Sequence, residues 1–175
     1  MKPLEKKFNR LKRIISGYKS CVVAFSGGQD SALLLKACSM VLPKGKILAV
    51  TAVSATYPDA ELAKARILAK DIGVRQKVIK TAELNNKNFA ANPVKRCYFC
   101  KKELFSKLIA LARRNKLNFV LDASNISDKE DYRPGNIAKK EFRIKSPLLE
   151  AGFSKGDIRK LSKKLGLSSW NKPSL

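Results

Sequence analysis

The sequence predicts an α/β fold, a doubly wound parallel sheet of about five strands with helices on both faces. Short apolar, β-branched runs alternate with longer segments whose apolar residues recur at helical spacing. The first of these runs leads into a glycine turn that opens a helix, as turns at the carboxyl ends of parallel strands do. At 175 residues, with no linker rich in Gly, Pro or Ser, the chain is expected to form one domain, residues 1–175.

Each expected element follows from a local pattern. Leu4, Phe8, Leu11 and Ile15 repeat at helical spacing, which predicts a helix over residues 3–17. In chain order there follow a strand over 20–25, a helix over 30–42, a strand over 46–53, a helix over 59–72 closed by Gly73, a strand over 74–80, a polar loop over 81–95, a helix over 97–115, a strand over 119–122, a short helix over 136–142 and a helix opened by the pattern Ser154-x-x-Asp157 and ended by Gly166.

Composition narrows the chemistry. The chain has no histidine, which excludes Ser–His, Cys–His and His–metal schemes built from its own residues. Its 37 Lys and Arg against 14 Asp and Glu give a net charge of +23, which would attract nucleotides and RNA. The basic residues are scattered, so a lysine-rich composition spread over solvated faces explains the charge as well.

Signals for export and disulfide formation are not evident. The N-terminus lacks the apolar segment of a signal peptide, and no apolar run approaches the ~20 residues of a membrane-spanning helix. We therefore expect a cytoplasmic protein that does not enter a membrane. Four cysteines do not make a disulfide scaffold at this length, and Cys21 and Cys38 are interpreted as small core residues.

The segment Ser26-Gly27-Gly28-Gln29-Asp30-Ser31 carries the strongest chemical signal. Glycines let the backbone lie close to a ligand, and the amides of a helix N-terminus attract phosphate. Ser26 and Ser31 add hydroxyl donors, and Asp30 offers a carboxylate that could cap the helix or hold Mg²⁺. The alternative is a glycine turn that binds nothing. No Lys follows the second glycine, so this is not a Walker-type loop.

The pattern Ser-Gly-Gly-x-Asp-Ser resembles the PP-loop of the ATP pyrophosphatases, which cleave ATP between its α and β phosphates. Further segments make the chain similar to one branch, the LarE-type sacrificial sulfur transferases, over nearly its whole length. These segments are Asn92-Pro93-x-x-Arg96-Cys97-Tyr98-Phe99-Cys100-Lys101-Lys102-Glu103-Leu104-Phe105, Asp131-Tyr132-Arg133-Pro134-Gly135, Ser146-Pro147-Leu148-Leu149-Glu150-Ala151-Gly152 and Leu165-Gly166-Leu167-x-x-Trp170-Asn171-Lys172-Pro173. The resemblance implies the HUP-type fold of the adenine nucleotide α-hydrolases.

The resemblance also implies a reaction. The carboxylate of a pyridinium mononucleotide attacks the α-phosphate of ATP, pyrophosphate leaves, and sulfur then displaces AMP, in the synthesis of a nickel-pincer cofactor. ATP and Mg²⁺ would be the cofactors. Catalytic roles are implied for Asp30, Asp131 and Arg133, and the alternative for the last two is a surface ion pair that caps a turn. The implied nucleotide-binding residues are Ser26, Gly27, Gly28, Asp30, Ser31, Ala52, Val53 and Asn125. Asp122-Ala123-Ser124-Asn125 replaces the family's usual Asp-Gly-Thr-Asn.

Cys97 and Cys100 form a single Cys-x-x-Cys. Alone this motif could be half of a metal site, a redox pair or chance. The family resemblance implies partial ligation of a [4Fe-4S] cluster if a third cysteine is supplied. In the family that cysteine follows the Trp-x-Lys-Pro segment, and here the sequence stops at Leu175. Three explanations fit this end point: a truncated chain, a split enzyme with a partner chain supplying the C-terminal domain, or a naturally short protein.

Three functions are therefore weighed. The first is LarE-type adenylation of a small carboxylate nucleotide, for which the resemblance implies an oligomer. The second is a PP-loop enzyme that modifies tRNA by thiolation or lysidine formation, which the charge and the Cys-x-x-Cys favour. The third is a non-catalytic nucleotide-binding subunit, which would bind ATP without releasing pyrophosphate.

Overall fold

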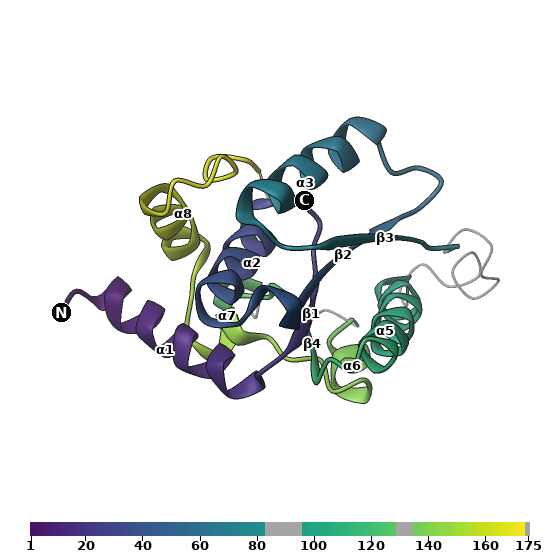
Figure 1. The fold of residues 1–175 in the computed structure, drawn as a ribbon, viewed down its shortest axis with the longest axis horizontal. Coiled ribbons are helices and arrows are strands. Elements are labelled where there is room, and N and C mark those ends of the chain that lie inside the picture. Colours follow the sequence, from purple (N-terminus) through teal and green to yellow (C-terminus); the bar gives the residue numbers. More distant parts are fainter. Residues whose placement is uncertain (83–95, 129–134, 174–175) are drawn as a thin grey trace.

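The computed structural model describes residues 1–82, 96–128 and 135–173. Its helices and strands alternate along most of the chain (Figure 1). In order they are α1 (Pro3–Tyr18), β1 (Cys21–Ala24), α2 (Gln29–Val41), η1 (Lys44–Lys46), β2 (Ile47–Val53), α3 (Asp59–Ile72), β3 (Gln76–Lys80), α5 (Arg96–Arg114), β4 (Phe119–Leu121), η4 (Ile126–Asp128), α6 (Gly135–Glu141), α7 (Pro147–Glu150) and α8 (Lys155–Lys164).

The four strands form one parallel sheet in the order β3-β2-β1-β4. The chain winds outward from β1 through β2 to β3, then crosses back to place β4 on the other side of β1. The order therefore reverses between β1 and β4. In open sheets of this kind, ligands bind beyond the carboxyl ends of the strands at such a reversal.

Helices cover both faces of the sheet because successive strand residues point to opposite sides (Figure 1). Cys21 and Val23 of β1 belong to a core with α1, α2, α3, α7 and α8. Val22, between them, belongs to a second core with α5 and α6. Burial on both faces explains why β1 and most of β2 read as continuous apolar runs.

The predicted fold class is confirmed, with helices close to their expected bounds. The described residues form four strands rather than about five. Next to β4, a single parallel bridge between Leu121 and Lys145 occupies the place where a fifth strand would lie. The short helix α7 was not expected, because four residues carry no readable periodicity.

Two smaller predictions concern the cysteines and the membrane. Cys21 and Cys38 are both fully buried, as expected of core residues. In the part of the chain that the structure covers, the helices lack the combination of length and apolarity that crossing a bilayer requires.

Candidate functional site

The glycine turn joins β1 to α2 at the carboxyl edge of the sheet. Gly27 has a φ of +82°, which side-chain-bearing residues rarely adopt. A Cβ on Gly27 would lie 2.8 Å from the Cβ of Ala65 in α3. Both facts require glycine here, since the turn is tight and α3 packs directly against it.

The first turn of α2 is left open. Gly28 is the N-cap, and no side chain accepts a hydrogen bond as a cap. Instead Ser26 Oγ accepts the Gly28 N–H at 3.2 Å and lies 3.1 Å from Ser31 Oγ. Two hydroxyls and the amides of the helix start therefore face the same point, an arrangement suited to a phosphate group.

Asp30 lies in this first turn in a costly environment. Its Oδ2 accepts a hydrogen bond from Asn125 Nδ2 at 3.2 Å, and its Oδ1 is buried without a partner among the described residues. Burial raises the pKa of Asp30, the nearby Asp128 raises it further, and Lys155 lowers it. An unpaired carboxylate oxygen beside a second carboxylate favours a bound cation.

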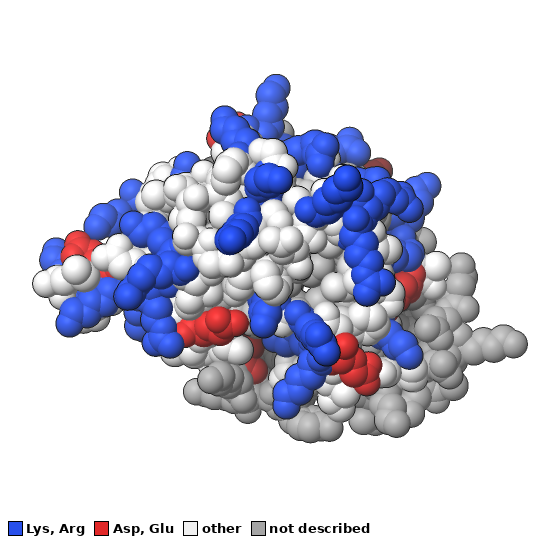
Figure 2. Space-filling view, turned by 60° about the horizontal axis from the view of Figure 1, so that its bottom comes forward, with Lys and Arg blue, Asp and Glu red and all other residues white. Residues whose placement is uncertain are grey.

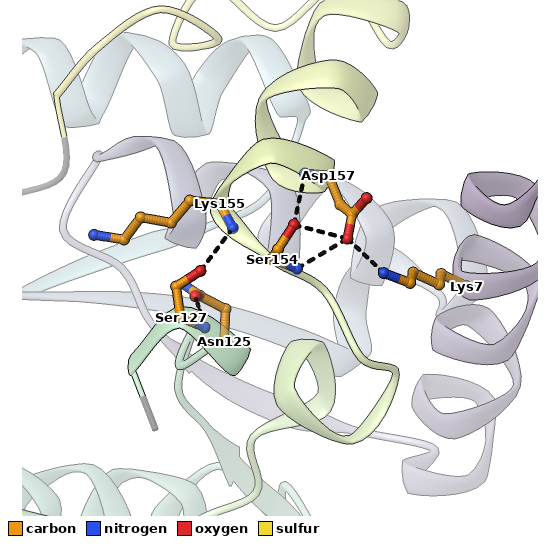
Figure 3. A network of polar contacts seen from close by, with 6 residues as sticks. All are labelled: Lys7, Asn125, Ser127, Ser154, Lys155 and Asp157. Carbon is orange, nitrogen blue, oxygen red and sulfur yellow. Dashed lines mark hydrogen bonds and ion pairs between the residues drawn. The ribbon is translucent and has the colours of Figure 1, made fainter. Parts of the chain in front are cut away.

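Asn125 is held in place by a series of hydrogen bonds that begins at α8 (Figure 3). Ser127 N–H donates to Asn125 Oδ1 at 3.0 Å, and the backbone N–H of Lys155 donates to Ser127 Oγ at 3.3 Å. The start of α8 is itself fixed by Ser154 and Asp157. Because Asn125 in turn donates to Asp30, these hydrogen bonds orient the Asp30 carboxylate.

A second carboxylate of the site, Asp122, is fully engaged. Its Oδ1 accepts from Ser146 Oγ at 2.6 Å, and its Oδ2 accepts from Ser124 Oγ at 2.9 Å. Lys139 Nζ lies 3.4 Å from Oδ2 and also donates to Ser124 Oγ. Asp122 therefore shapes the wall, whereas Asp30 Oδ1 has no hydrogen-bond partner in the part of the chain that the structure describes.

These groups surround a cleft of about 560 Å³. Among the predicted nucleotide-binding residues, Ser26, Gly28, Asp30, Ser31 and Ala52 line the cleft. Gly27 shapes the turn, and Asn125 donates a hydrogen bond to Asp30 without lining the cleft itself. Val53 follows Ala52, and its carbonyl accepts the Thr81 N–H.

Sequence reasoning missed several residues of the cleft. Lys101 and Lys155 line it from α5 and α8, and Tyr57 lines it while donating to the Ser26 carbonyl. Gln29, also a lining residue, is buried and donates through Nε2 to the Trp170 carbonyl, which ties the C-terminal segment to the loop. Tyr57, Lys101 and Lys155 lie far from the glycine turn along the sequence, and the contact between Gln29 and Trp170 joins residues 141 apart, so neither had a local signal.

Other predicted site residues cannot be placed. Asp131, Arg133 and the side chain of Cys97 lie outside the described residues, and Cys100 is partly exposed in α5. Within the described ranges, His, Cys, Asp and Glu residues form no group of three that could hold a metal ion. The cluster prediction therefore stays a prediction.

Comparison with known proteins agrees with this geometry. A family model described as NAD synthase matches residues 5–125, which include the glycine turn and end at Asn125. The chain belongs to the NAD synthase family. That family is part of the PP-loop superfamily, so the predicted relationship is confirmed.

Two curated relatives cover most of the chain. An uncharacterized protein from Synechocystis is 41% identical over 97% of this chain and 63% of its own length. The pyridinium-3,5-bisthiocarboxylic acid mononucleotide synthase of Lactiplantibacillus plantarum, a LarE protein, is 39% identical over 86% of this chain and 54% of its own length. The chain therefore spans between half and two thirds of these relatives.

Solved structures share the fold at low identity. The NH₃-dependent NAD synthetase from Campylobacter jejuni aligns over 96% of this chain and 75% of its own, with a TM-score of 0.76 and 21% identity. The U34-tRNA thiolase NcsA from Methanococcus maripaludis aligns over 97% of this chain and 67% of its own, with a TM-score of 0.67 and 15% identity.

Proposed function

We propose that this chain binds ATP and activates the carboxylate of a pyridinium mononucleotide as an acyl-adenylate, with release of pyrophosphate. The observation that carries the proposal is the open first turn of α2, with the unpaired Oδ1 of Asp30, at the point where the strand order reverses. The substrate class comes from the name of the Lactiplantibacillus plantarum relative.

The chemistry is a transfer of the adenylyl group. A carboxylate oxygen of the substrate forms a bond to the α-phosphorus, and the bond from that phosphorus to the bridging oxygen of pyrophosphate breaks. The leaving pyrophosphate takes the electron pair. The enzyme must hold the phosphates and stabilise the negative charge that develops on them.

The residues of the cleft divide these tasks. The α2 amides, Ser26 and Ser31 would cradle the departing pyrophosphate, since both hydroxyls lie at the start of α2. Lys101 and Lys155 line the same cleft and would balance phosphate charge. Ala52, at the end of β2, offers an apolar wall for the adenine.

Magnesium fits Asp30. The carboxylate is buried, its Oδ1 has no partner among the described residues, and its pKa is raised by burial and by Asp128. A hard divalent cation prefers such oxygen ligands. When bound, Mg²⁺ would neutralise phosphate charge, and Asp30 would hold it against the loop.

The sulfur-transfer half of the reaction is a separate proposal. In a LarE-type scheme the adenylate would be displaced by sulfur, from a cysteine or from a cluster held in part by Cys97 and Cys100. A partner or a further segment would then supply a third cysteine, and the active form would be an oligomer. Anaerobic reconstitution with iron, comparing wild type and Cys97→Ala, tests the cluster.

A tRNA substrate is the second candidate, favoured by the net charge of +23. Here ATP would activate a base of the tRNA instead of a carboxylate. The fold shared with the tRNA thiolase is compatible with both functions. A non-catalytic nucleotide-binding subunit is the third.

The test follows pyrophosphate release from ATP and Mg²⁺ with either the pyridinium-3,5-dicarboxylate mononucleotide or total tRNA, with products identified by mass spectrometry. We expect an adenylated mononucleotide from wild type. Asp30→Asn should reduce pyrophosphate release by about 100-fold, because the residue acts on charge in the transition state. Asp71→Asn makes the same change on an exposed carboxylate at the far end of α3 and should change nothing.

Each other outcome redirects the assignment. Pyrophosphate release that depends on tRNA would replace the small substrate by RNA. ATP binding without pyrophosphate in either mixture would contradict an activating enzyme and favour a binding subunit. Equal activity of Asp30→Asn and wild type would remove Asp30 from the site.

A further inference from the structure

A second hollow lies at the opposite end of the sheet from the nucleotide cleft. It is a groove of about 590 Å³ along the outer side of β4, between the ends of α5 and α6. Asn118 and Phe119, at the amino end of β4, form part of its wall. Because the strands are parallel, this end of β4 points away from the loop that binds the nucleotide.

Cations line this groove against a single carboxylate. Arg113, Arg143 and Lys145 are lining residues, with Lys145 Nζ 5.7 Å from the centre of the Phe119 ring. The carboxylate is Glu141, which accepts a hydrogen bond from the Tyr98 hydroxyl at 2.9 Å. The charge of the groove is therefore positive, beside apolar and aromatic walls.

Backbone strain marks the same end of the molecule. Among the described residues, positive φ outside glycine occurs at Lys19, Lys116 and Arg143, with values of 66°, 55° and 54°. Lys19 and Lys116 precede β1 and β4, and Arg143 precedes the Lys145 bridge beside β4. All three side chains are exposed. Glycine or asparagine would adopt this backbone more cheaply, so the sequence holds a cation at each strained position.

Contacts within the structure place two of these residues near the groove. The Asn118 N–H donates to Ser20 Oγ, and Asn118 Nδ2 donates to the Tyr18 carbonyl, so residues 18–20 lie beside Asn118. Lys116 is two residues from Asn118 along the chain. The basic pole, defined by these cations, consists of Lys19, Arg113, Lys116, Arg143 and Lys145.

We propose that the basic pole binds single-stranded RNA, independently of the nucleotide cleft. The cations would contact backbone phosphates, and a base would enter the groove against Phe119 and Phe142. The groove is concave, which suits a flexible strand better than a flat bilayer surface. The two aromatic residues in its lining, Phe119 and Phe142, suit a base better than an acidic peptide.

A structural role for the cations is the competing explanation. Lys19, Lys116 and Arg143 follow the carboxyl ends of α1, α5 and α6, where positive charge favours the helix dipole. The charge is also widespread, since Lys and Arg cover much of the face shown in Figure 2. The experiment must therefore distinguish RNA binding at the basic pole from attraction by the overall charge and from an effect of the cations on stability.

The test uses the triple variant Lys19→Gly, Lys116→Gly and Arg143→Gly. Glycine removes three charges and relieves the positive φ, so thermal unfolding should occur at an unchanged or higher temperature. The matched control is Lys6→Gln, Arg10→Gln and Arg13→Gln, three exposed cations of α1. Binding of a fluorescein-labelled oligouridine of about 20 nucleotides is measured by anisotropy between about 50 and 200 mM salt.

We expect the affinity of the pole variant for the RNA to fall by at least about tenfold at physiological salt. The slope of log affinity against log salt concentration should become shallower by about 2, because each phosphate contact on a single strand contributes about 0.7 to it. The α1 control should lose less than about threefold, and both variants should retain wild-type pyrophosphate release. Equal losses in the two triples would overturn the proposal in favour of diffuse charge. Unchanged RNA binding with a lower unfolding temperature would assign the cations to the helix ends.

Competition separates the classes of polyanion. Polyglutamate or anionic phosphatidylglycerol vesicles that displace the RNA at equal charge concentration would replace RNA by an acidic protein or a membrane surface. Variants of the cleft, Lys101→Gln and Lys155→Gln, should leave oligouridine binding unchanged. If they weaken it while the pole variant does not, RNA binds at the cleft and the proposed pole is wrong.

Discussion

The helices α2 and α8 each carry an acidic residue in the first turn, and the two residues differ in how they are hydrogen-bonded. In α8, Ser154 and Asp157 form a capping box, and Lys7 of α1 donates to Asp157 at 2.6 Å. In α2 the N-cap is Gly28, which has no side chain to accept a hydrogen bond, and one oxygen of Asp30 is buried without a partner among the described residues. The polar groups at the start of α8 are therefore hydrogen-bonded within the protein, whereas those at the start of α2 remain available to a ligand.

The pKa values follow this difference. Burial alone would raise the pKa of Asp157, but the hydrogen bonds from Lys7 and Ser154 outweigh it and hold the pKa below its ordinary value. Burial raises the pKa of Asp30, and Asp128 adds to the effect. Asp157 is thus an ion that stabilises the fold, and Asp30 is one that the fold holds at a cost. Such a cost is expected where a ligand completes the site.

The largest effect is expected from placing a side chain in the glycine turn before α2. Gly27→Ala forces an L residue into φ +82° and places a Cβ 2.8 Å from Ala65. We expect ATP binding to fall by about 100-fold, because donors to the phosphates lose their alignment. Isothermal titration with ATP and Mg²⁺ measures it.

Gly152→Ala is the matched control. Gly152 has a similar φ of +79°, but nothing lies within 4 Å of the added Cβ. It should cost about 1 kcal/mol of stability from the backbone alone and leave ATP binding intact. ATP binding that survives Gly27→Ala as well would show that the turn does not hold the nucleotide.

The second prediction removes the unfavourable charge. Because the folded-state pKa of Asp30 is raised, its ionisation opposes folding, and this penalty is absent at low pH and complete once the pH exceeds the raised pKa. Asp30→Asn should therefore be more stable than wild type at pH 7. The difference should shrink as the pH falls toward about 4, the ordinary pKa of Asp.

Urea unfolding at a series of pH values in the absence of nucleotide measures this difference. The control, Asp71→Asn, makes the same substitution at an exposed carboxylate of α3 and is measured in parallel. A variant less stable than wild type at pH 7 would mean that Asp30 serves the fold, and the contrast with Asp157 would disappear.

How far each region could be predicted from sequence follows from the separation of its partners. The pattern Ser154-x-x-Asp157 correctly predicted the start of α8, because a capping box joins residues three apart. The glycine turn was equally readable, since strand, turn and helix are contiguous. Asn125, in contrast, reaches Asp30 across 95 residues. The family resemblance predicts this residue as a nucleotide contact, but its bond to Asp30 has no local signal in the sequence.

The structure also distinguishes two carboxylates of the cleft, Asp30, which is predicted as a site residue, and Asp122, which is not. Asp30 and Asp122 each follow a strand, and both lie in the cleft. Only the fold shows that Ser146 and Lys139 saturate Asp122, because they approach from segments that follow β4. Long-range contacts of this kind decide which carboxylate is available for chemistry.

The third prediction opens the closed turn. Ser154→Ala removes the side chain that accepts the Asp157 N–H, and the loss of such a cap costs about 1 kcal/mol. For a domain of this size that lowers the melting temperature by about 2–4 °C. Ser154→Thr keeps the hydroxyl and should restore most of the loss. A variant as stable as wild type would show that Asp157 and Lys7 fix the helix start without the serine.

The smallest expected effect belongs to the ion pair that supports the closed turn. Lys7 and Asp157 retain 34% and 20% of their side-chain exposure, so Lys7→Met should cost only about 0.5 kcal/mol at pH 7. Since the folded-state pKa of Asp157 is lowered, its contribution is present above the ordinary pKa of Asp and is lost as the pH falls through the lowered one. The penalty of Lys7→Met should vanish in acid and shrink in high salt, as measured by urea unfolding. A penalty independent of both would show that the charge of the pair does not explain the role of Lys7, and the two helix starts would then differ in hydrogen bonding and not in charge.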